Sequence, residues 1–395
     1  MVDGYKKYEM KKIYVIIGST SGGVSGGIIY HLNKLNYMKK KGWESLILSS
    51  DDGQVMVPAI SDFIWGNYTF LKQFPNSYPN KLLSDKLQLI LNLFEEKAAS
   101  DIIIESSTET TALWGELFAR KLKCRHIIIY INEFSLCMNS SLALFFKFKY
   151  NRGELACISK QHMIKIFKKY WIVDENNARA LPCSCTNSLQ KCDSKYNLLA
   201  LSGKTIGYIG RIDKPFFNNM LSEILDYCKS NKNIHYNLFI FGGSNQAKAV
   251  NILKKRCSIH KNISLIVTGF IYPIPFEATQ QLDVIFACAG SAVVAYKTGK
   301  PAIRIDNVDY KLSGVIKSQN PLILEMCPLG NTYSKYLSWI LESTPKISIK
   351  KYDLSIDEIN TERKLDEHIR FINNISSELL YYNIGNIGPV DILRG

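Results

Sequence analysis

The stretch IYVIIGSTSGGVSGGIIYHLNKLNYMKKKGWESLIL, residues 13–48, indicates the fold class of this protein. It begins with a continuous apolar run, passes through a loop rich in glycine and serine, and then places apolar residues at helical spacing as far as Gly42. A second apolar run follows at 44–48. A strand that is apolar at every residue is typical of a parallel sheet covered on both faces. The stretch therefore predicts a strand–loop–helix–strand unit of an α/β domain.

The same alternation of apolar runs and helical stretches continues along the chain and predicts two α/β domains. Residues 1–175 form the first domain in this interpretation and residues 203–345 the second, joined by a linker at 176–202. Residues 346–395 contain a tail and a helix, expected near 362–382, that packs back on the first domain. Further strands are expected at 101–105, 125–131, 154–159, 205–210, 237–241, 263–267, 283–287 and 302–305.

The length and charge of the chain limit the class of protein. The 395 residues are enough for two hydrophobic cores, and the formal net charge is +14 at pH 7. This excess of positive charge favours contact with phosphates, either of an anionic membrane or of a phosphorylated substrate. A positive charge of this size is explained equally well by solubility in water. No recognition motif for nucleic acid occurs, so no nucleic-acid partner is expected. Because the sequence shows neither a membrane span nor a signal peptide, we expect a cytoplasmic protein.

The ten cysteines give no reason to expect a metal site. Most of them stand singly inside apolar runs, as in proteins of a reducing compartment. Cys183, Cys185 and Cys192 lie closer together, but no histidine accompanies them at the spacing of a zinc finger. We therefore predict that the protein binds no metal.

Several loops that follow predicted strands could hold a phosphate. The loop SGGVSGG, 21–27, leads into a helix and lets the backbone approach a ligand, although plain tight turns explain it as well. The loop GRIDK, 210–214, carries an arginine and a lysine where doubly wound sheets bind ligands. The sequence GSA, 290–292, begins a helix, so its N–H groups can face an anion. Further loops at strand ends are FGGS, 241–244, and TGF, 268–270.

The order of these parts resembles that of the GT-B glycosyltransferases, in particular the group 1 (family 4) type, across most of the chain. The resemblance rests on degenerate pieces whose order and spacing are distinctive. These pieces are Gly26-Gly27, KGWE (41–44), ELACISKQHM (154–163), YIGRIDK (208–214), LFIFGGS (238–244), IVTGFI (266–271), LDVIFA (282–287) and GKPAI (299–303).

The resemblance implies the GT-B fold, which has two Rossmann-like, doubly wound domains facing a cleft, with the acceptor on the first and a nucleotide-sugar donor on the second. It implies that Arg211 and Lys214 act in catalysis as a cation pair on the donor diphosphate, whose developing charge they would stabilise without a metal. A UDP-sugar is the expected donor, as co-substrate, and no cofactor is implied. The implied donor-binding residues are Gly26, Gly27, Gly210, Arg211, Lys214, Gly242, Gly243, Gly269, Phe270, Ile271, Gly290, Ser291 and Ala292.

The chain departs from the family pattern at two acidic positions. The family usually has two glutamates, eight positions apart, of which the first contacts the sugar and the second the ribose. Counted back from Pro301, they would fall at Phe286 and Val294. Ribose and sugar recognition must therefore come from other residues, or be lost.

Other carboxylates of the first half are candidates for the acceptor side. After the strand 125–131, where the family often has a histidine, the chain has Asn132 and Glu133. Both are acceptor-binding candidates, and Glu133 is also a candidate catalytic base, although it would serve equally well as a helix-capping or surface residue. Glu105 and Glu109 are weaker candidates.

These features predict a glycosyltransferase that acts on a saccharide or lipid-linked saccharide, in polysaccharide biosynthesis of the capsule or O-antigen type, with retention of configuration favoured. The stretch ALFFKFKYNR, 143–152, interleaves aromatic and basic residues. It would either hold the protein at the inner face of the membrane as a peripheral protein or form a helix half buried in the core. Two alternatives stay open: a sugar-nucleotide epimerase of the same architecture, and a degenerate, non-catalytic nucleotide-sugar-binding protein.

Overall fold

The computed structural model divides the chain into two compact units. The first comprises residues 1–21, 27–184 and 358–395, and the second comprises 22–26 and 185–357. The segment expected to be a linker, 176–202, is thus shared between them, because its strand β7 pairs with β11 of the second unit. The structure describes residues 12–95, 97, 101–131, 138–196, 201–244, 246–306, 309–318, 323–342 and 355–387.

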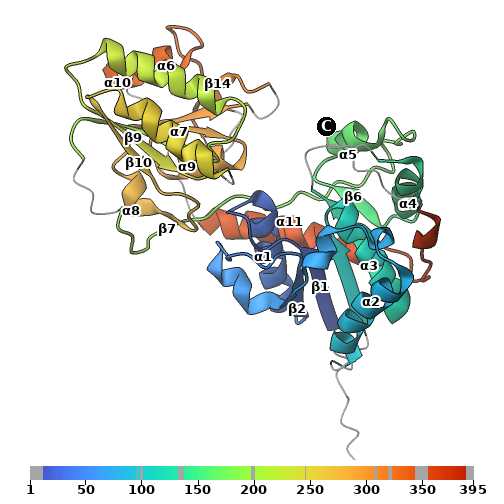
Figure 1. Ribbon diagram of the computed structural model, residues 1–395. Coiled ribbons are helices and arrows are strands. Elements are labelled where there is room, and N and C mark those ends of the chain that lie inside the picture. The colour runs from blue at the N-terminus through green and yellow to red at the C-terminus, as the bar shows by residue number, and fades with distance from the viewer. Residues whose placement is uncertain are drawn as a thin grey trace, which may run out of the picture. The chain divides into compact units, whose positions relative to one another are not determined.

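The first unit is built on a parallel sheet with the strand order β3-β2-β1-β4-β5-β6 (Figure 1). Its strands are β1 (Lys12–Gly18), β2 (Glu44–Ser49), β3 (Ile64–Asn67), β4 (Asp101–Ser106), β5 (Arg125–Tyr130) and β6 (Leu155–Cys157). Its α-helices are α1 (Gly26–Lys40), α2 (Asn80–Glu95), α3 (Glu109–Leu122), α4 (Ser140–Asn151), α5 (Lys160–Phe167) and most of α11 (Ser355–Asn373). Short 3₁₀ turns lie at Pro58–Phe63, Thr69–Lys72, Pro75–Ser77 and Ile384–Asn386.

Burial on both faces of the sheet explains the continuous apolar run at residues 13–17. Ile13, Val15 and Ile17 of β1 have no exposed surface and pack in one cluster with Trp114 and Phe118 of α3. Successive side chains of a strand point to opposite faces. Tyr14 therefore lies on the other face, where its hydroxyl contacts Glu105.

The C-terminal helix packs back on the first unit, as the sequence predicts, but it begins at Ser355 and ends at Asn373. Asp366 of α11 accepts a hydrogen bond from the hydroxyl of Tyr37 of α1. The ring of His368 lies 5.9 Å from that of Tyr30. The residues between 374 and 382, expected to be helical, instead form an irregular tail with a turn and bends that lies on the first unit.

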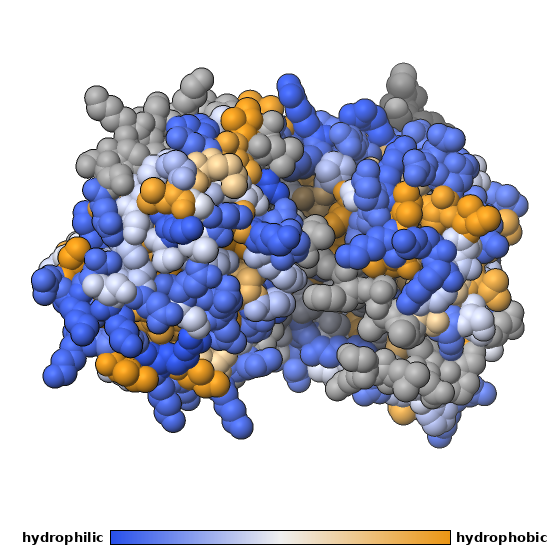
Figure 2. Space-filling view, turned by 90° about the horizontal axis from the view of Figure 1, so that it is seen from above, coloured by the Kyte–Doolittle hydropathy of each residue, from blue (hydrophilic) through white to orange (hydrophobic). Residues whose placement is uncertain are grey.

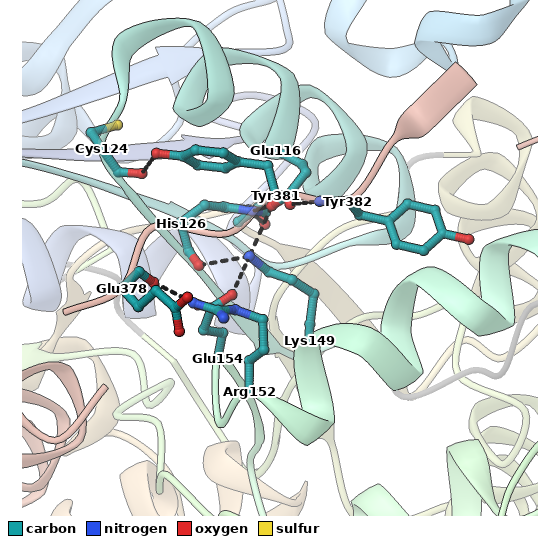
Figure 3. Close-up of polar contacts among 10 residues, drawn as sticks. Glu116, Cys124, His126, Lys149, Arg152, Glu154, Glu378, Tyr381 and Tyr382 are labelled. Atoms are coloured by element: carbon teal, nitrogen blue, oxygen red, sulfur yellow. Dashed lines mark hydrogen bonds and ion pairs between the residues drawn. The ribbon is translucent and has the colours of Figure 1, made fainter. Parts of the chain in front are cut away.

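A buried ionic network attaches this tail to the first unit (Figure 3). Lys149 Nζ lies 2.8 Å from Glu116 Oε2 and 2.6 Å from Glu154 Oε2, and all three side chains are at most 7% exposed. The backbone N–H of Tyr382 donates to Glu116 Oε1 at 2.7 Å. Arg152 bonds both Glu154 and the carbonyl of Glu378. Two carboxylates, a lysine and an arginine thus hold this tail in place at Glu378 and Tyr382.

His126 completes this network as a neutral ring. Burial, followed by the nearby Lys149, lowers the pKa of His126 to about 4. Its Nδ1–H therefore donates to Glu116 Oε2 at 2.8 Å, and its Nε2 accepts from the hydroxyl of Ser106 at 2.9 Å. Burial alone would raise the pKa of Glu116, but Lys149 and His126 lower it to about 2.

The second unit has a mostly parallel sheet with the order β10-β9-β8-β12-β13-β14-β15, whose last two strands run antiparallel to their neighbours. Helices α6, α7 and α10 contribute to the core on one face, and α8 and α9 to that on the other. Its strands are β7 (Leu189–Gln190), β8 (Lys204–Ile209), β9 (Tyr236–Phe241), β10 (Ile263–Val267), β11 (Ile274–Pro275), β12 (Val284–Cys288), β13 (Ala302–Ile305), β14 (Leu312–Ile316) and β15 (Leu324–Glu325). Its helices are α6 (Phe217–Ser230), α7 (Ala247–Ser258), α8 (Phe276–Thr279), α9 (Gly290–Lys297) and α10 (Tyr333–Glu342). The prediction of two Rossmann-like, doubly wound sheets is confirmed.

The aromatic and basic stretch 143–152 belongs largely to the core of the first unit. Phe145 and Phe146 have no exposed surface, and Tyr150 is buried as well. Lys149, one of the basic residues of this stretch, is the buried centre of the ionic network. The stretch therefore does not present an aromatic face to a membrane. No described helix is long and apolar enough to cross a bilayer.

Candidate functional site

The candidate site of the second unit lies where the strand order of its sheet reverses. The chain crosses from β8–β10 to β12–β13 at this point, and β8 and β12 are direct neighbours, with Ile209 opposite Ala287. The loops that leave these two strands carry Gly210 and Arg211 on one side and lead to Gly290 on the other. Ligands of doubly wound sheets bind at such a switch point. The structure thus brings two separately predicted segments to one edge of the sheet.

Glycines allow the loops after β8, β9 and β10 to touch through their backbones. A Cβ on Gly242 would lie 1.9 Å from the carbonyl oxygen of Gly210, and a Cβ on Gly243 would lie 3.1 Å from the backbone nitrogen of Phe270. Gly269 has φ +73°, a backbone conformation that favours glycine. These predicted residues therefore lie in loops that pack on one another at the carboxyl edge of the sheet.

The start of α9 offers backbone donors to an anion. No side chain of a described residue caps this helix end, and the first turn contains no acidic residue. The N-cap residue Ala289 has φ 52° and ψ −131°, which is strained for a residue other than glycine. A Cβ on Gly290 would lie 3.5 Å from the hydroxyl of Thr186, so this hydroxyl is a further polar group beside the helix start. Free N–H groups at a helix start attract phosphate.

The two predicted cations occupy different surroundings in the loop after β8. Arg211 donates from Nε and Nη2 to the carboxylate of Asp213 at 2.8 and 3.2 Å, and its side chain is 44% exposed. Lys214 is half-buried and lines a pocket between α6 and α7. Asp213 was missed as a partner of Arg211, although its place two residues later in GRIDK was a visible signal.

The two positions where the family pattern has glutamates are buried in this fold. Phe286 lies inside β12 and Val294 on the packed face of α9, and neither has exposed surface. The ring of Phe286 packs 5.5 Å from that of Tyr333. A carboxylate at either place would be removed from water, which is unfavourable for a charged group. Neither position therefore offers a polar group to a ligand at this edge.

An aspartate orders the first glycine-rich loop at the carboxyl edge of the first sheet. Asp51, which follows β2, accepts hydrogen bonds from the backbone N–H groups of Thr20 and Ser21 at 3.1 Å each. Lys72 Nζ lies 2.6 Å from its other oxygen. Burial alone would raise the pKa of Asp51, but the bonds from Lys72, Ser19 and Ser21 lower it. These two amides thus already bind a carboxylate rather than a phosphate.

In the loop SGGVSGG, only the residues after Ser21 remain available to a ligand. Gly22 and Gly23 have φ of +83° and +116°, and α1 begins at Gly26 with Gly27 as its next residue. The Asp51 contact was missed, although the pair of aspartates directly after a strand was a signal.

The carboxylates proposed for the first unit are not open to a substrate where the structure describes them. Glu105 has no exposed surface and accepts hydrogen bonds from Tyr14 and Tyr30. Glu109 is 2% exposed and accepts one from Tyr130. The predicted acceptor residues Asn132 and Glu133 lie outside the described residues, so their roles stay predictions. Among the described residues no group of three histidine, cysteine, aspartate or glutamate side chains could hold a metal ion.

The alanine variant of Gly242 tests the contact between the loops. We expect Gly242→Ala to push the loops after β8 and β9 apart, since its Cβ meets backbone 1.9 Å away. If the protein binds UDP at this edge, as the resemblance implies, the variant should bind it at least about tenfold more weakly. Isothermal titration calorimetry measures the affinity. Gly299→Ala is the control for glycine replacement without a steric clash, because a Cβ there meets nothing within 4 Å, although its φ of +73° makes alanine unfavourable at that position. Equal affinities of the two variants would contradict the prediction.

The comparisons with known proteins agree on the fold. No model of a known protein family matches the sequence, and no curated protein matches it. A solved glycosyltransferase from Rickettsia africae is similar with a TM-score of 0.58 and 13% identity, over 93% of this chain and 95% of that one. The pneumococcal O-GlcNAc transferase GtfA, solved with UDP and GlcNAc, has a TM-score of 0.55 and 9% identity, over 94% and 100%. The UDP-GlcNAc 2-epimerase of Neisseria meningitidis has a TM-score of 0.48 and 11% identity, over 92% and 99%. At these identities the first two similarities show the fold alone, and that fold is GT-B.

Proposed function

We propose that this protein is a glycosyltransferase that transfers a sugar from a nucleotide donor to a saccharide or lipid-linked saccharide. The observation that carries the proposal is the convergence of Gly210, Arg211 and Gly290 at the switch point between β8 and β12. A cation and an uncapped helix start at one sheet edge suit the diphosphate of a nucleotide sugar. The GT-B fold, shared with solved glycosyltransferases, supports the same class of substrate.

The proposed reaction places negative charge where the second unit offers positive groups. Breaking the bond between sugar and phosphate leaves a nucleoside diphosphate with a developing charge. Arg211, Lys214 and the N–H groups at Gly290 and Ser291 would stabilise that charge, so the proposal needs no metal ion. Arg211 would exchange its contact with Asp213, or share it, when the diphosphate binds. We take a UDP-sugar as the donor and Thr186 as one of the groups that replace the absent glutamates.

The acceptor side and the setting of the reaction are parts of the same proposal. Asn132 and Glu133 are proposed to contact the acceptor, with Glu133 as a base if the reaction inverts configuration. The resemblance to group 1 enzymes favours retention of the anomeric configuration of the sugar. The proposed setting is polysaccharide assembly at the inner face of the membrane, with the enzyme bound peripherally.

The proposal is tested by titrating the full-length protein with a panel of nucleoside diphosphates and measuring slow hydrolysis of the matching nucleotide sugars. Binding of one diphosphate together with release of its sugar is the expected result. If no nucleoside diphosphate binds, the proposal fails. Release of an isomerised sugar nucleotide would assign an epimerase, and binding without any turnover, with every acceptor tried, would assign a non-catalytic binding protein.

A further inference from the structure

The second unit has a long segment of one charge sign. Between residues 227 and 276 the sequence contains no aspartate or glutamate. The lysines and arginines of this segment are Lys229, Lys232, Lys248, Lys254, Lys255, Arg256 and Lys261. Five of these seven cations lie on α7 or directly after it, so the positive charge is concentrated at this helix.

Two of these lysines share a stripe of α7 with isoleucines that remain exposed. Lys248, Ile252, Lys255 and Ile259 are spaced by four, three and four residues, which places them on one face of a helix. Ile252 is 54% exposed and Ile259, the C-cap residue with helical φ and ψ, is 76% exposed. The opposite side of α7 carries Leu253 and Cys257, both 2% exposed, so the stripe faces away from the core.

The remaining cations of α7 and a shallow pocket border this stripe. Lys254 is exposed, and Arg256 lines a pocket of about 260 Å³ between α6 and α7 together with Lys248 and Ile252. The floor of the pocket includes Leu221 and Leu253, which belong to the core. Figure 1 shows α7 beside α6, and Figure 2 shows that hydrophobic residues form separate spots on a mainly hydrophilic surface.

We infer that this α7 face, defined by Lys248, Ile252, Lys255 and Ile259, docks on the surface of an anionic lipid bilayer. Isoleucines at the centre of a basic face can enter the boundary between headgroups and acyl chains, while lysines beside them bind lipid phosphates. A nucleic acid would use the lysines but would have no use for two exposed isoleucines between them. The inference extends the proposed function, because it names the surface that would hold the enzyme near a lipid-linked acceptor.

Vesicle sedimentation of the full-length protein tests the inference. Wild-type protein is expected to sediment with vesicles of phosphatidylcholine and phosphatidylglycerol in equal parts, and not with phosphatidylcholine alone. The variant Lys248→Glu/Lys255→Glu should lose at least about tenfold in partitioning to the anionic vesicles, because two attractive charges become repulsive. The variant Ile252→Ser/Ile259→Ser should also lose binding, although its charge is unchanged. All four residues are exposed, so both variants are expected to fold, which circular dichroism checks.

A charge-matched control separates this face from the general positive charge of the protein. Lys121→Glu/Lys123→Glu makes the same change of charge at the exposed end of α3 in the first unit, and it should bind vesicles like the wild type. Equal loss of binding in this control, or no difference between the two kinds of vesicle, would overturn the inference. So would binding of an RNA oligonucleotide that depends on the lysines but not on the isoleucines. No donor or acceptor is present in the assay, so a failed glycosyltransferase proposal leaves its result intact.

Discussion

Replacing Lys149 by methionine is expected to lower the free energy of unfolding of the first unit by about 3–5 kcal/mol. The lysine is 1% exposed and is the shared cation of Glu116 and Glu154, which are 0% and 7% exposed. Removing the lysine leaves two buried carboxylates without the positive charge that offsets their loss of hydration. Glu116 also holds the C-terminal tail by accepting a hydrogen bond from the N–H of Tyr382. Urea unfolding followed by tryptophan fluorescence measures the effect.

The design of this experiment uses two features of the chain. Four of the five tryptophans, at positions 43, 65, 114 and 171, belong to the first unit, so the fluorescence reports mainly on it. Lys147→Met is the matched control, since Lys147 lies on the same helix but is exposed. If Lys149→Met is as stable as Lys147→Met, the network does not stabilise the unit as described.

Acid titration gives a second readout of the same network. The pKa of Glu116 is lowered from 4.5 to about 2, so its contribution to stability is present above pH 4.5 and is lost as the pH falls toward 2. The pKa of His126 is lowered from 6.5 to about 4, so stability also decreases as the pH falls through that range. Without Lys149 the pKa of Glu116 rises toward its usual value, and the loss of stability below pH 4.5 should become smaller in the variant.

Replacing Arg211 or Lys214 by alanine is expected to lower the proposed sugar release from the donor by about 100- to 1000-fold. Each cation would stabilise charge that develops on the diphosphate, so the effect should appear mainly in kcat, with a smaller loss of UDP affinity in calorimetry. Both residues lie in the loop after β8, outside its hydrogen-bonded ladder, so the fold should survive. Turnover of the donor without acceptor is measured, because this assay does not depend on knowing the acceptor.

Lys335→Ala on α10 is the control for these variants, because it removes one exposed positive charge from the same unit. Wild-type turnover in Arg211→Ala or Lys214→Ala would refute the role assigned to that residue. If Arg211→Ala alone keeps its activity, the pairing with Asp213 is structural and Lys214 carries the charge stabilisation by itself.

Much of the candidate site of the second unit followed from local patterns. A glycine or a cation directly after an apolar run falls at the carboxyl end of a strand in any parallel sheet, so Gly210, Gly242 and Gly290 could be placed at one edge. Their close packing could not be predicted, because the 1.9 Å approach of Gly242 to Gly210 depends on how two loops cross. That these residues bind a nucleotide sugar remains a prediction.

Predictions of a residue's role from its residue type alone were less successful. Glu105 and Glu109 resemble catalytic acids in the sequence but are buried hydrogen-bond acceptors of tyrosines. Lys149 resembles a surface lysine of an amphipathic stretch but lies in the core. Glu105 and Glu109 depend on tyrosines far away in the chain, which no local pattern can reveal. Lys149 depends on the equally distant Glu116 as well as on Glu154, five residues later.

The sequence by itself determined that this protein has two sheets of buried parallel strands, since continuous apolar runs separated by helices bury both faces of a sheet only in that arrangement. It also determined which loops end at the carboxyl edge. The tertiary structure alone decided the strand order, and with it the position of the switch point beside Arg211 and Gly290. It also decided that Asp51 binds the amides of the first loop and that α7 exposes a stripe of lysine and isoleucine. These features depend on contacts between segments far apart in the chain, which the physical chemistry of single segments does not specify.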